Sequence, residues 1–346
     1  MRYREIGSTG IKVSELGFGV WTLATTWWGK HDDASAQGLL KASLDLGVNF
    51  FDTADSYGQG RGETLLADLT KTVPRESIVI ASKFGYDWQN APNVEGHGES
   101  PQDYSVAFVE QALEGALRRL STDYIDLWQL HNPRMPALEN DELFTFLDRA
   151  KQAGRIRAVG VALGPAIGWR DEGVHALRER GVDVIHMIYN LLEQDPGREL
   201  IEVARESGAG VLVRVPHSSG MLEGKYTRET KFDASDHRVH RTQEWLHRGL
   251  DALDKLEFLT ADTGMTIGQA ALRYVLASPE VASALPNIYN NEQLREFAAA
   301  SDFPELQPEQ VERVNTLYDS EFKRAFAPKQ QDSATKPARE AVGTSQ

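Results

Sequence analysis

The sequence contains no cysteine among its 346 residues, which excludes disulfide bridges, thiolate nucleophiles and thiolate metal ligands. It also has no apolar run of about 18 residues, so no transmembrane helix is expected. The charged residues near the start are not followed by an apolar segment, so no secretory signal peptide is expected in residues 1–30. These absences indicate a cytoplasmic protein with no membrane partner.

Positive charge is also scarce, because 37 Lys and Arg stand against 51 Asp and Glu, for a formal net charge of −14. This excess of negative charge disfavours nucleic acid and anionic membranes as partners. A small molecule is the expected partner, and both a monomer and a homo-oligomer stay open. The hydrophobic fraction of 41% is enough for one large core.

What is present is an alternation of short apolar runs with helix-length segments. Residues 2–14 predict a β-hairpin. After the hairpin, eight strands are expected, separated by segments with apolar residues at i, i+3 and i+4. Eight strand–helix units in series predict a parallel sheet closed into a (β/α)8 TIM barrel. The expected strands are residues 16–19, 48–52, 78–83, 125–131, 156–161, 184–189, 211–215 and 281–285.

An open, doubly wound sheet is the alternative fold. Such sheets that bind dinucleotides carry a G-x-G-x-x-G motif after the first strand, whereas this chain has only the pair Gly17 and Gly19 there. The barrel is therefore favoured, as a single domain over residues 1–327 with an extra C-terminal helix. Residues 328–346 are polar without an apolar period, which predicts a disordered tail.

Two expected connections are unusually long, at residues 86–102 after the third strand and 217–242 after the seventh. Long loops in compact domains are usually functional or disordered, and in a barrel both would follow the carboxyl ends of strands. Aromatic side chains in such loops provide apolar walls for a substrate. Simple filling of the loop interior by the tryptophans is the alternative. The candidate substrate contacts are Trp21, Trp28, Trp88 and His217.

Four chemically active side chains fall at or just after strand ends. Asp52 ends the second expected strand and Tyr57 follows it, while Lys83 and His131 end the third and fourth. The carboxyl ends of barrel strands converge on one mouth, so these groups can meet. Lys83 would stabilise the phenolate of Tyr57, and Asp52 would hold Lys83 charged. His131 would hydrogen-bond a substrate carbonyl, and a purely structural role for the ion pair is the alternative.

Five segments in consistent order resemble signature segments of the aldo-keto reductases. They are residues 51–58 with Glu63, 82–84, 124–131, 153–161 and 220–226. The resemblance implies a (β/α)8 barrel with a catalytic tetrad at Asp52, Tyr57, Lys83 and His131. It also implies NAD(P)H bound across the barrel mouth, and interconversion of an aldehyde, ketone, sugar or polyol between its carbonyl and alcohol forms by hydride transfer.

The same resemblance implies a set of cofactor contacts, several of which depart from the family pattern. Ala162 and Leu163 stand where the family usually carries Ser and Asn, and Arg214 replaces an aromatic residue that stacks on the nicotinamide. No cation precedes Arg295 in the segment that would meet a 2′-phosphate, which favours NAD over NADP. The expected cofactor contacts are Ala162, His186, Arg214, Val215, Pro216, Asn287, Tyr289, Gln293 and Glu296.

Two functional alternatives stay open beside the NAD(P)-dependent oxidoreductase. One is proton chemistry by the tetrad with a nucleotide that is retained or absent. The other is a binding or regulatory protein without turnover, against which the intact tetrad argues. Histidines at several strand ends could bind a metal, but no H-E-x-x-H or similar spacing is present, so no metal is expected.

Overall fold

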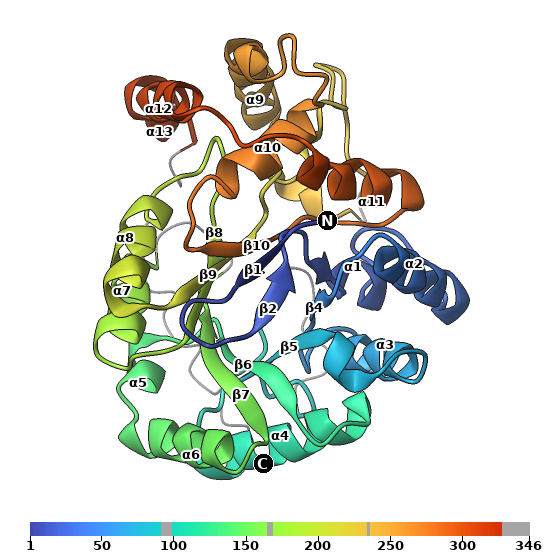
Figure 1. Cartoon of the computed structure of the whole chain (residues 1–346), viewed down its shortest axis with the longest axis vertical. Helices are drawn as coiled ribbons and strands as arrows, with labels where there is room; N and C mark the ends of the chain where they lie inside the picture. Colours follow the sequence, from blue (N-terminus) through green and yellow to red (C-terminus); the bar gives the residue numbers. More distant parts are fainter. Residues whose placement is uncertain (91–98, 165–168, 234–235, 327–346) are drawn as a thin grey trace, which may run out of the picture.

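The computed structural model describes residues 1–90, 99–164, 169–233 and 236–326, so the expected tail lies outside the described residues (Figure 1). Eight parallel strands follow one another around a single sheet. They are β3 (Phe18–Gly19), β4 (Phe50–Asp52), β5 (Val79–Phe84), β6 (Ile125–His131), β7 (Ile156–Ala162), β8 (Val184–Ile188), β9 (Gly210–Arg214) and β10 (Val281–Leu285).

The first and last segments of this sheet are joined, which closes the barrel. The amide of Gly17 donates to the carbonyl of Ala284 at 2.9 Å, and the amide of Ala284 donates to the carbonyl of Glu15 at 2.8 Å. Closure leaves no unpaired sheet edge and brings all eight strand ends to one mouth. The predicted (β/α)8 barrel is confirmed.

A helix follows each strand and the helices form a ring around the sheet (Figure 1). These eight are α2 (Asp33–Asp45), α3 (Arg61–Thr70), α4 (Val106–Leu120), α6 (Asp141–Gln152), α7 (Arg170–Arg178), α8 (Gly197–Ser207), α10 (Ile267–Val275) and α11 (Asn291–Ala298). Additional helices are α1 (Trp21–Ala24), α5 (Met135–Leu138), α9 (Gln243–Leu256), α12 (Pro308–Leu317) and α13 (Lys323–Phe326), of which α12 is the predicted extra C-terminal helix.

Short helical turns complete the connections. Those of 3₁₀ type are η1 (Arg75–Ser77), η2 (Met221–Glu223), η3 (His237–His240), η4 (Glu257–Leu259) and η5 (Ala299–Asp302), and η6 (Tyr318–Phe322) is a π turn. Local sequence sets several helix ends. Thr266 and Gln269 form a capping box at the start of α10. Gly208 adopts φ +74° after α8 and so forms a left-handed C-cap, a conformation that glycine adopts without steric strain.

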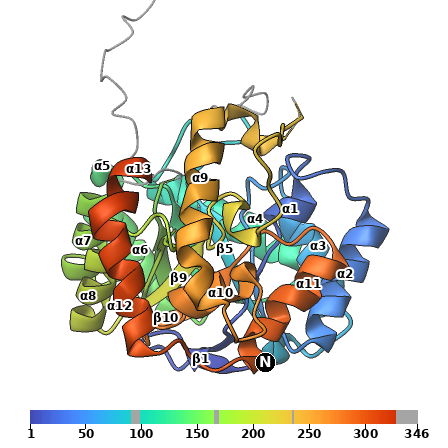
Figure 2. The same ribbon diagram turned by 90° about the horizontal axis from the view of Figure 1, so that it is seen from above.

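The N-terminal hairpin closes the end of the barrel opposite the mouth that the carboxyl ends of the strands form. It pairs β1 (Tyr3–Glu5) with antiparallel β2 (Lys12–Ser14). Ile6, Ile11 and Val13 pack into one buried cluster with interior residues such as Phe50 and Leu127. The hairpin crosses the centre of the ring in Figure 1, and in Figure 2 β1 lies at the bottom edge with α9 at the opposite end.

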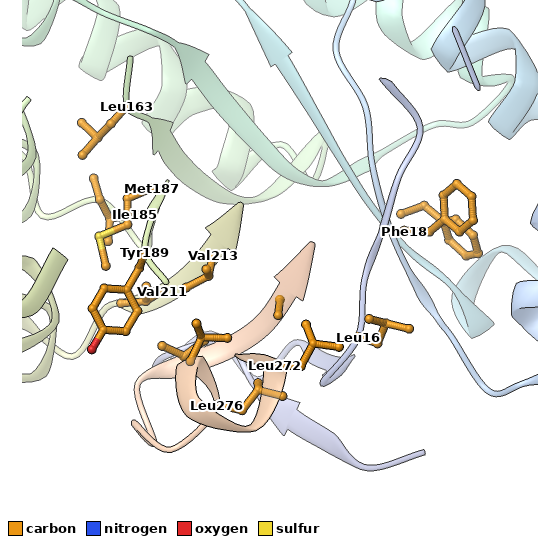
Figure 3. Packing of buried hydrophobic residues seen from close by; sticks show 14 of the residues in the cluster. Leu16, Phe18, Leu163, Ile185, Met187, Tyr189, Val211, Val213, Leu272 and Leu276 are labelled. Atoms are coloured by element: carbon orange, nitrogen blue, oxygen red, sulfur yellow. The ribbon is translucent and has the colours of Figure 1, made fainter. Parts of the chain in front are cut away.

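Strand alternation separates the barrel interior from the layer beneath the helices. Ile185 and Met187 of β8 point outward with Val211 and Val213 of β9, and Figure 3 shows them in the layer that also contains Leu272 of α10 and Leu276, which follows this helix. The intervening positions therefore face the interior, since neighbouring strand residues point to opposite faces. This period directs residues 186 and 214 toward the barrel mouth.

Asp126 anchors β6 to its neighbours near the closed end of the barrel. Its fully buried carboxylate accepts from Arg75 Nη2 at 2.7 Å and from Arg157 Nη1 at 2.6 Å. It also accepts from the backbone amide of Ile80 at 2.9 Å. One side chain thus ties three adjacent strands together through charge-assisted hydrogen bonds.

We expect Asp126→Ala to lower the free energy of unfolding by about 3 kcal/mol, because it removes a buried acceptor and leaves the Ile80 amide without a partner. Urea unfolding followed by circular dichroism measures the difference. Asp123→Ala, at an exposed position close by, is the control and should change stability by less than about 0.5 kcal/mol. Equal stability of the two variants would contradict the anchoring role of Asp126.

Candidate active site

A cavity of about 250 Å³ opens at the carboxyl ends of the strands and contains all four predicted catalytic side chains. Asp52 comes from the end of β4, Tyr57 from the loop after it, Lys83 from β5 and His131 from β6. The rest of the wall is formed by Gly19, Trp21, Trp28, Asn132, His186, Ile188, Arg214, Val215, Ser219, His237, Leu285, Pro286 and Asn287. Barrel closure brings these distant segments together.

A buried ion pair lies at the base of this cavity. Lys83 Nζ is 2.6 Å from Asp52 Oδ1 and donates to the carbonyl of Thr53 at 2.7 Å. The other carboxylate oxygen of Asp52 accepts from Gln129 Nε2 at 3.2 Å. Both charges are thus compensated by close partners, as burial requires. The ammonium lies 4.9 Å from the ring centre of Tyr57 and so faces the phenol.

His131 is held edge-on between two tyrosine rings. Its ring centre lies 5.7 Å from that of Tyr57 and 4.8 Å from that of Tyr86. Its carbonyl accepts from Gln102 Nε2 at 3.0 Å and from the hydroxyl of Tyr104 at 2.6 Å, which fixes the backbone. Burial, reinforced by the charges of Lys83 and Arg214, lowers the pKa of His131 well below its usual value. The imidazole is therefore neutral and carries one N–H donor.

His186 and Arg214 occupy the side of the cavity where the resemblance implies the nicotinamide. His186 is buried, with Nδ1 3.8 Å from Asp52 Oδ2, which is beyond hydrogen-bond range. Neither of its nitrogens has a partner among the described residues, and burial lowers its pKa well below the usual value. Arg214 Nη2 donates to the carbonyls of Leu163, at 2.5 Å, and Gly164.

The remaining expected cofactor positions differ in how they are placed. Ala162 and Pro216 are buried, and Val215 and Asn287 line the cavity. Beyond the mouth, the ring of Tyr289 stacks on Trp28 with centres 6.0 Å apart. These positions extend from the cavity to the start of α11.

Two polar residues expected at the far end of the cofactor are engaged with the protein. Gln293 is fully buried, accepts from the amide of Tyr289 at 3.2 Å and donates to Glu223 Oε2 at 2.9 Å. Glu296 accepts from the hydroxyl of Thr266 at 2.8 Å. Gln293 therefore fixes the start of α11 from beneath.

His217, expected to contact substrate, lies outside the cavity. Its Nε2 is 3.0 Å from the carbonyl of Gly268, and its ring centre is 4.4 Å from that of Phe297. The side chain is buried between the loop after β9 and helices α10 and α11. The structure corrects this expectation, because the chain turns after Val215, at φ +55°, and no longer follows the alternation of the strand.

Trp88 is also placed away from the active cavity. It lines a separate cavity of about 470 Å³ between the loop after β5 and helix α4, together with Asp55 and Arg119. The guanidinium of Arg119 lies 5.7 Å from its ring centre. Trp88 therefore does not line the active cavity as expected, because the loop places its indole outward over α4. Trp21 and Trp28, in contrast, line the active cavity.

Several residues of the site were not foreseen from the sequence. Gln129 donates a hydrogen bond to Asp52. The sequence could have indicated this residue, because it is polar and lies at an interior position of β6, two residues before His131. Asn132 donates from Nδ2 to the hydroxyl of Tyr86 at 2.7 Å and forms part of the wall. His237 packs against Trp21 with ring centres 5.1 Å apart, and only the fold brings these two loops together.

Within residues 1–90, 99–164, 169–233 and 236–326, no group of three or more His, Asp or Glu side chains is arranged to hold a metal ion. The same residues contain no helix with the length and apolar character needed to cross a membrane.

The sequence profile of the Aldo/keto reductase family matches residues 15–319. Aldo-keto reductase YhdN of Bacillus subtilis (strain 168) is 29% identical over 339 residues, which cover 95% of this chain and 97% of the relative. The NADH-specific methylglyoxal reductase of Escherichia coli (strain K12) is 28% identical over 308 residues, covering 87% and 93%. The glycerol dehydrogenase of Gluconobacter oxydans is similar in structure, with a TM-score of 0.77, 25% identity and coverage of 96% and 98%.

The buried position of His217 predicts a specific pH dependence of stability. Burial lowers the pKa of His217 from 6.5 to about 4. Below pH 6.5, the unfolded chain binds a proton at His217 that the folded chain does not. The free energy of unfolding is therefore at its full value above pH 6.5 and decreases as the pH falls toward 4. The loss amounts to about 3 kcal/mol.

Urea unfolding at several pH values between 4 and 7 should therefore show a flatter profile for His217→Gln than for the unaltered protein. Glutamine keeps a donor for the Gly268 carbonyl but does not titrate. His131 and His186 titrate in both proteins, so their contributions cancel in the difference. Parallel profiles would contradict a neutral, buried His217.

Proposed function

The chain belongs to the aldo/keto reductase family, and we propose that it interconverts a small carbonyl compound and its alcohol by hydride exchange with NAD(P). The family assignment makes it an oxidoreductase that acts on carbonyl or alcohol groups. The proposal rests on one observation, the meeting of Asp52, Tyr57, Lys83 and His131 in a single cavity. The similarity to a methylglyoxal reductase and a glycerol dehydrogenase supports a small substrate.

Each of the four side chains has a distinct role in this proposal. When bound, NAD(P)H supplies the hydride and its two electrons to the carbonyl carbon. The hydroxyl of Tyr57 gives its proton to the carbonyl oxygen, and Lys83 stabilises the negative charge left on the phenol. Asp52 keeps the ammonium charged and oriented. Neutral His131 donates a hydrogen bond to the same oxygen, and alcohol oxidation reverses these steps.

The residues present fit a nicotinamide cofactor in a modified site. Ala162 and Leu163 offer no polar side-chain atoms to a carboxamide. His186 compensates, since its two buried nitrogens lack partners among the described residues and can serve one donor and one acceptor. Asn287 adds a further amide to the cavity wall. We therefore assign the carboxamide contacts to His186 and Asn287.

The far end of the proposed cofactor site favours NAD over NADP. The ammonium of Lys225 lies 3.9 Å from carboxylate oxygens of both Glu292 and Glu296. Arg238 is bound by Asp236 at 2.6 Å. Because these cations are already balanced, a 2′-phosphate would gain little from them and would meet the carboxylates of α11. The NADH specificity of the Escherichia coli relative supports the same choice.

We expect Tyr57→Phe to lower kcat by at least about 1,000-fold, because it removes the proton donor and keeps the ring. Turnover of a small aldehyde such as methylglyoxal, followed by NADH absorbance, measures the loss. Binding of NADH, followed by quenching of tryptophan fluorescence, should be unchanged. Tyr3→Phe, in the hairpin at the opposite end, is the matched control, and activity of Tyr57→Phe close to that control would refute the proton transfer.

A titration with both reduced cofactors tests the cofactor assignment. We expect the dissociation constant for NADH to be at least about tenfold lower than that for NADPH, since a phosphate beside carboxylates is repelled. The double variant Glu292→Gln/Glu296→Gln should narrow the difference by freeing Lys225. Before the titration, a sample of the protein is denatured, and the absorbance spectrum of its supernatant is recorded to detect a retained nucleotide. Tighter binding of NADPH than of NADH would contradict the proposed repulsion of the 2′-phosphate by the carboxylates of α11.

A further inference from the structure

The active cavity contains a partly buried cation that forms no ion pair with a carboxylate of the described residues. Arg214 projects into the cavity from the end of β9. Among the described residues, its hydrogen bonds go only to the carbonyls of Leu163 and Gly164. By comparison, Arg119 pairs with Glu63 and Arg238 pairs with Asp236, each at 2.6 Å. A guanidinium that is partly withdrawn from water, with its Nε buried and without a carboxylate partner, carries a free-energy cost that an incoming anion would offset.

The other charged and titratable side chains of the cavity do not compensate the charge of Arg214. The ammonium of Lys83 and the carboxylate of Asp52 neutralise each other at 2.6 Å. His131 and His186 are neutral, because burial lowers the pKa of each well below its usual value. Arg214 stays protonated, as arginine does in proteins. These five side chains together therefore carry one net positive charge, which lies on Arg214.

Donor groups of Arg214 are also left over. Nη2 is engaged with the two carbonyls, whereas Nε is buried without a partner and no partner is found for Nη1 among the described residues. The carbonyl contacts fix the guanidinium plane, so that these donors are held in a defined direction. A planar, fixed guanidinium is well suited to bind a carboxylate.

We propose that Arg214 binds the carboxylate of the substrate, so that the enzyme acts on short oxo acids and hydroxy acids in preference to neutral carbonyl compounds. This inference rests on the proposed oxidoreductase function and adds the substrate class to it. The carboxylate lies against Arg214 while the reacting oxygen lies between Tyr57 and His131, all of which line one cavity of about 250 Å³. A cavity of this size suits a short carbon frame.

The choice of a carboxylate also resolves a conflict at the nicotinamide side. An unbalanced guanidinium repels the positive ring of the oxidised cofactor. A substrate carboxylate bound to Arg214 removes that repulsion, so oxidation of a hydroxy acid becomes compatible with the charge of the site. A neutral alcohol leaves the repulsion in place. The same residue thus couples substrate charge to the redox state of the cofactor.

The test compares matched substrates with and without the anion, namely 4-oxobutanoate against butanal and glucuronate against glucose. We expect kcat/KM of the unaltered protein to be at least about tenfold higher for the acid of at least one pair. Arg214→Gln should lower kcat/KM for that acid about 10- to 100-fold more than it lowers kcat/KM for the neutral partner, so that the preference for the acid is lost. Arg214→Lys keeps the charge and should retain part of the preference.

A control variant and a binding measurement keep the outcomes separate. Arg178→Gln removes the same charge from an exposed ion pair on α7 and should leave both substrates unchanged. Binding of butanoate and of uncharged butanamide, followed by tryptophan fluorescence, needs no turnover. We expect butanoate to bind more tightly to the unaltered protein, and Arg214→Gln to abolish this difference.

Equal use of acid and neutral substrates by the unaltered protein, or equal losses on both in Arg214→Gln, would overturn the role of Arg214 and leave the oxidoreductase function standing. No turnover of any pair with cofactor bound would instead count against the proposed function. In that event, the butanoate measurement decides on Arg214 alone. Binding that is weak, or that does not depend on Arg214, would overturn the anion site as well.

Discussion

The buried ion pair between Lys83 and Asp52 is the interaction around which the active cavity is built. Two charges withdrawn from water are stable only when each has close partners, and here Thr53 and Gln129 supply them. The pair therefore holds β4, β5 and β6 in a fixed relation at the mouth. It also places a cation beside the ring of Tyr57, where it would stabilise the phenolate in the proton transfer proposed above.

The rest of the barrel holds this pair in position and shields it from solvent. The hairpin fills the opposite end with apolar side chains, and the strands direct alternate residues inward. That alternation brings His186 and Arg214 to the same cavity as the tetrad. The proposed catalytic half of the site and the proposed nicotinamide half are thus both formed by residues of one sheet, and Arg214 lies in the cavity that they share.

The structure brings the expected residues at strand ends together in one cavity, but it places two of the expected loop residues elsewhere. Asp52, Lys83 and His131 lie at strand ends, where the backbone direction follows from the fold, and the structure brings them together. His217 and Trp88 lie only a few residues beyond strand ends and point elsewhere. Once a chain leaves the sheet, packing against neighbouring helices decides where a side chain points, and no local pattern encodes it.

The sequence by itself determined the eight-fold order of strands and helices, the order of the four reactive residues and the absence of thiol chemistry. These follow from periodicity and from residue type, which are local properties. Only the tertiary structure decided which charges are compensated. Lys83 and Arg214 are both cations at strand ends, yet Lys83 has a carboxylate at 2.6 Å, whereas Arg214 has only carbonyl oxygens as partners in the described part of the chain. Compensation depends on distances between segments far apart in the chain, which the closure of the barrel sets.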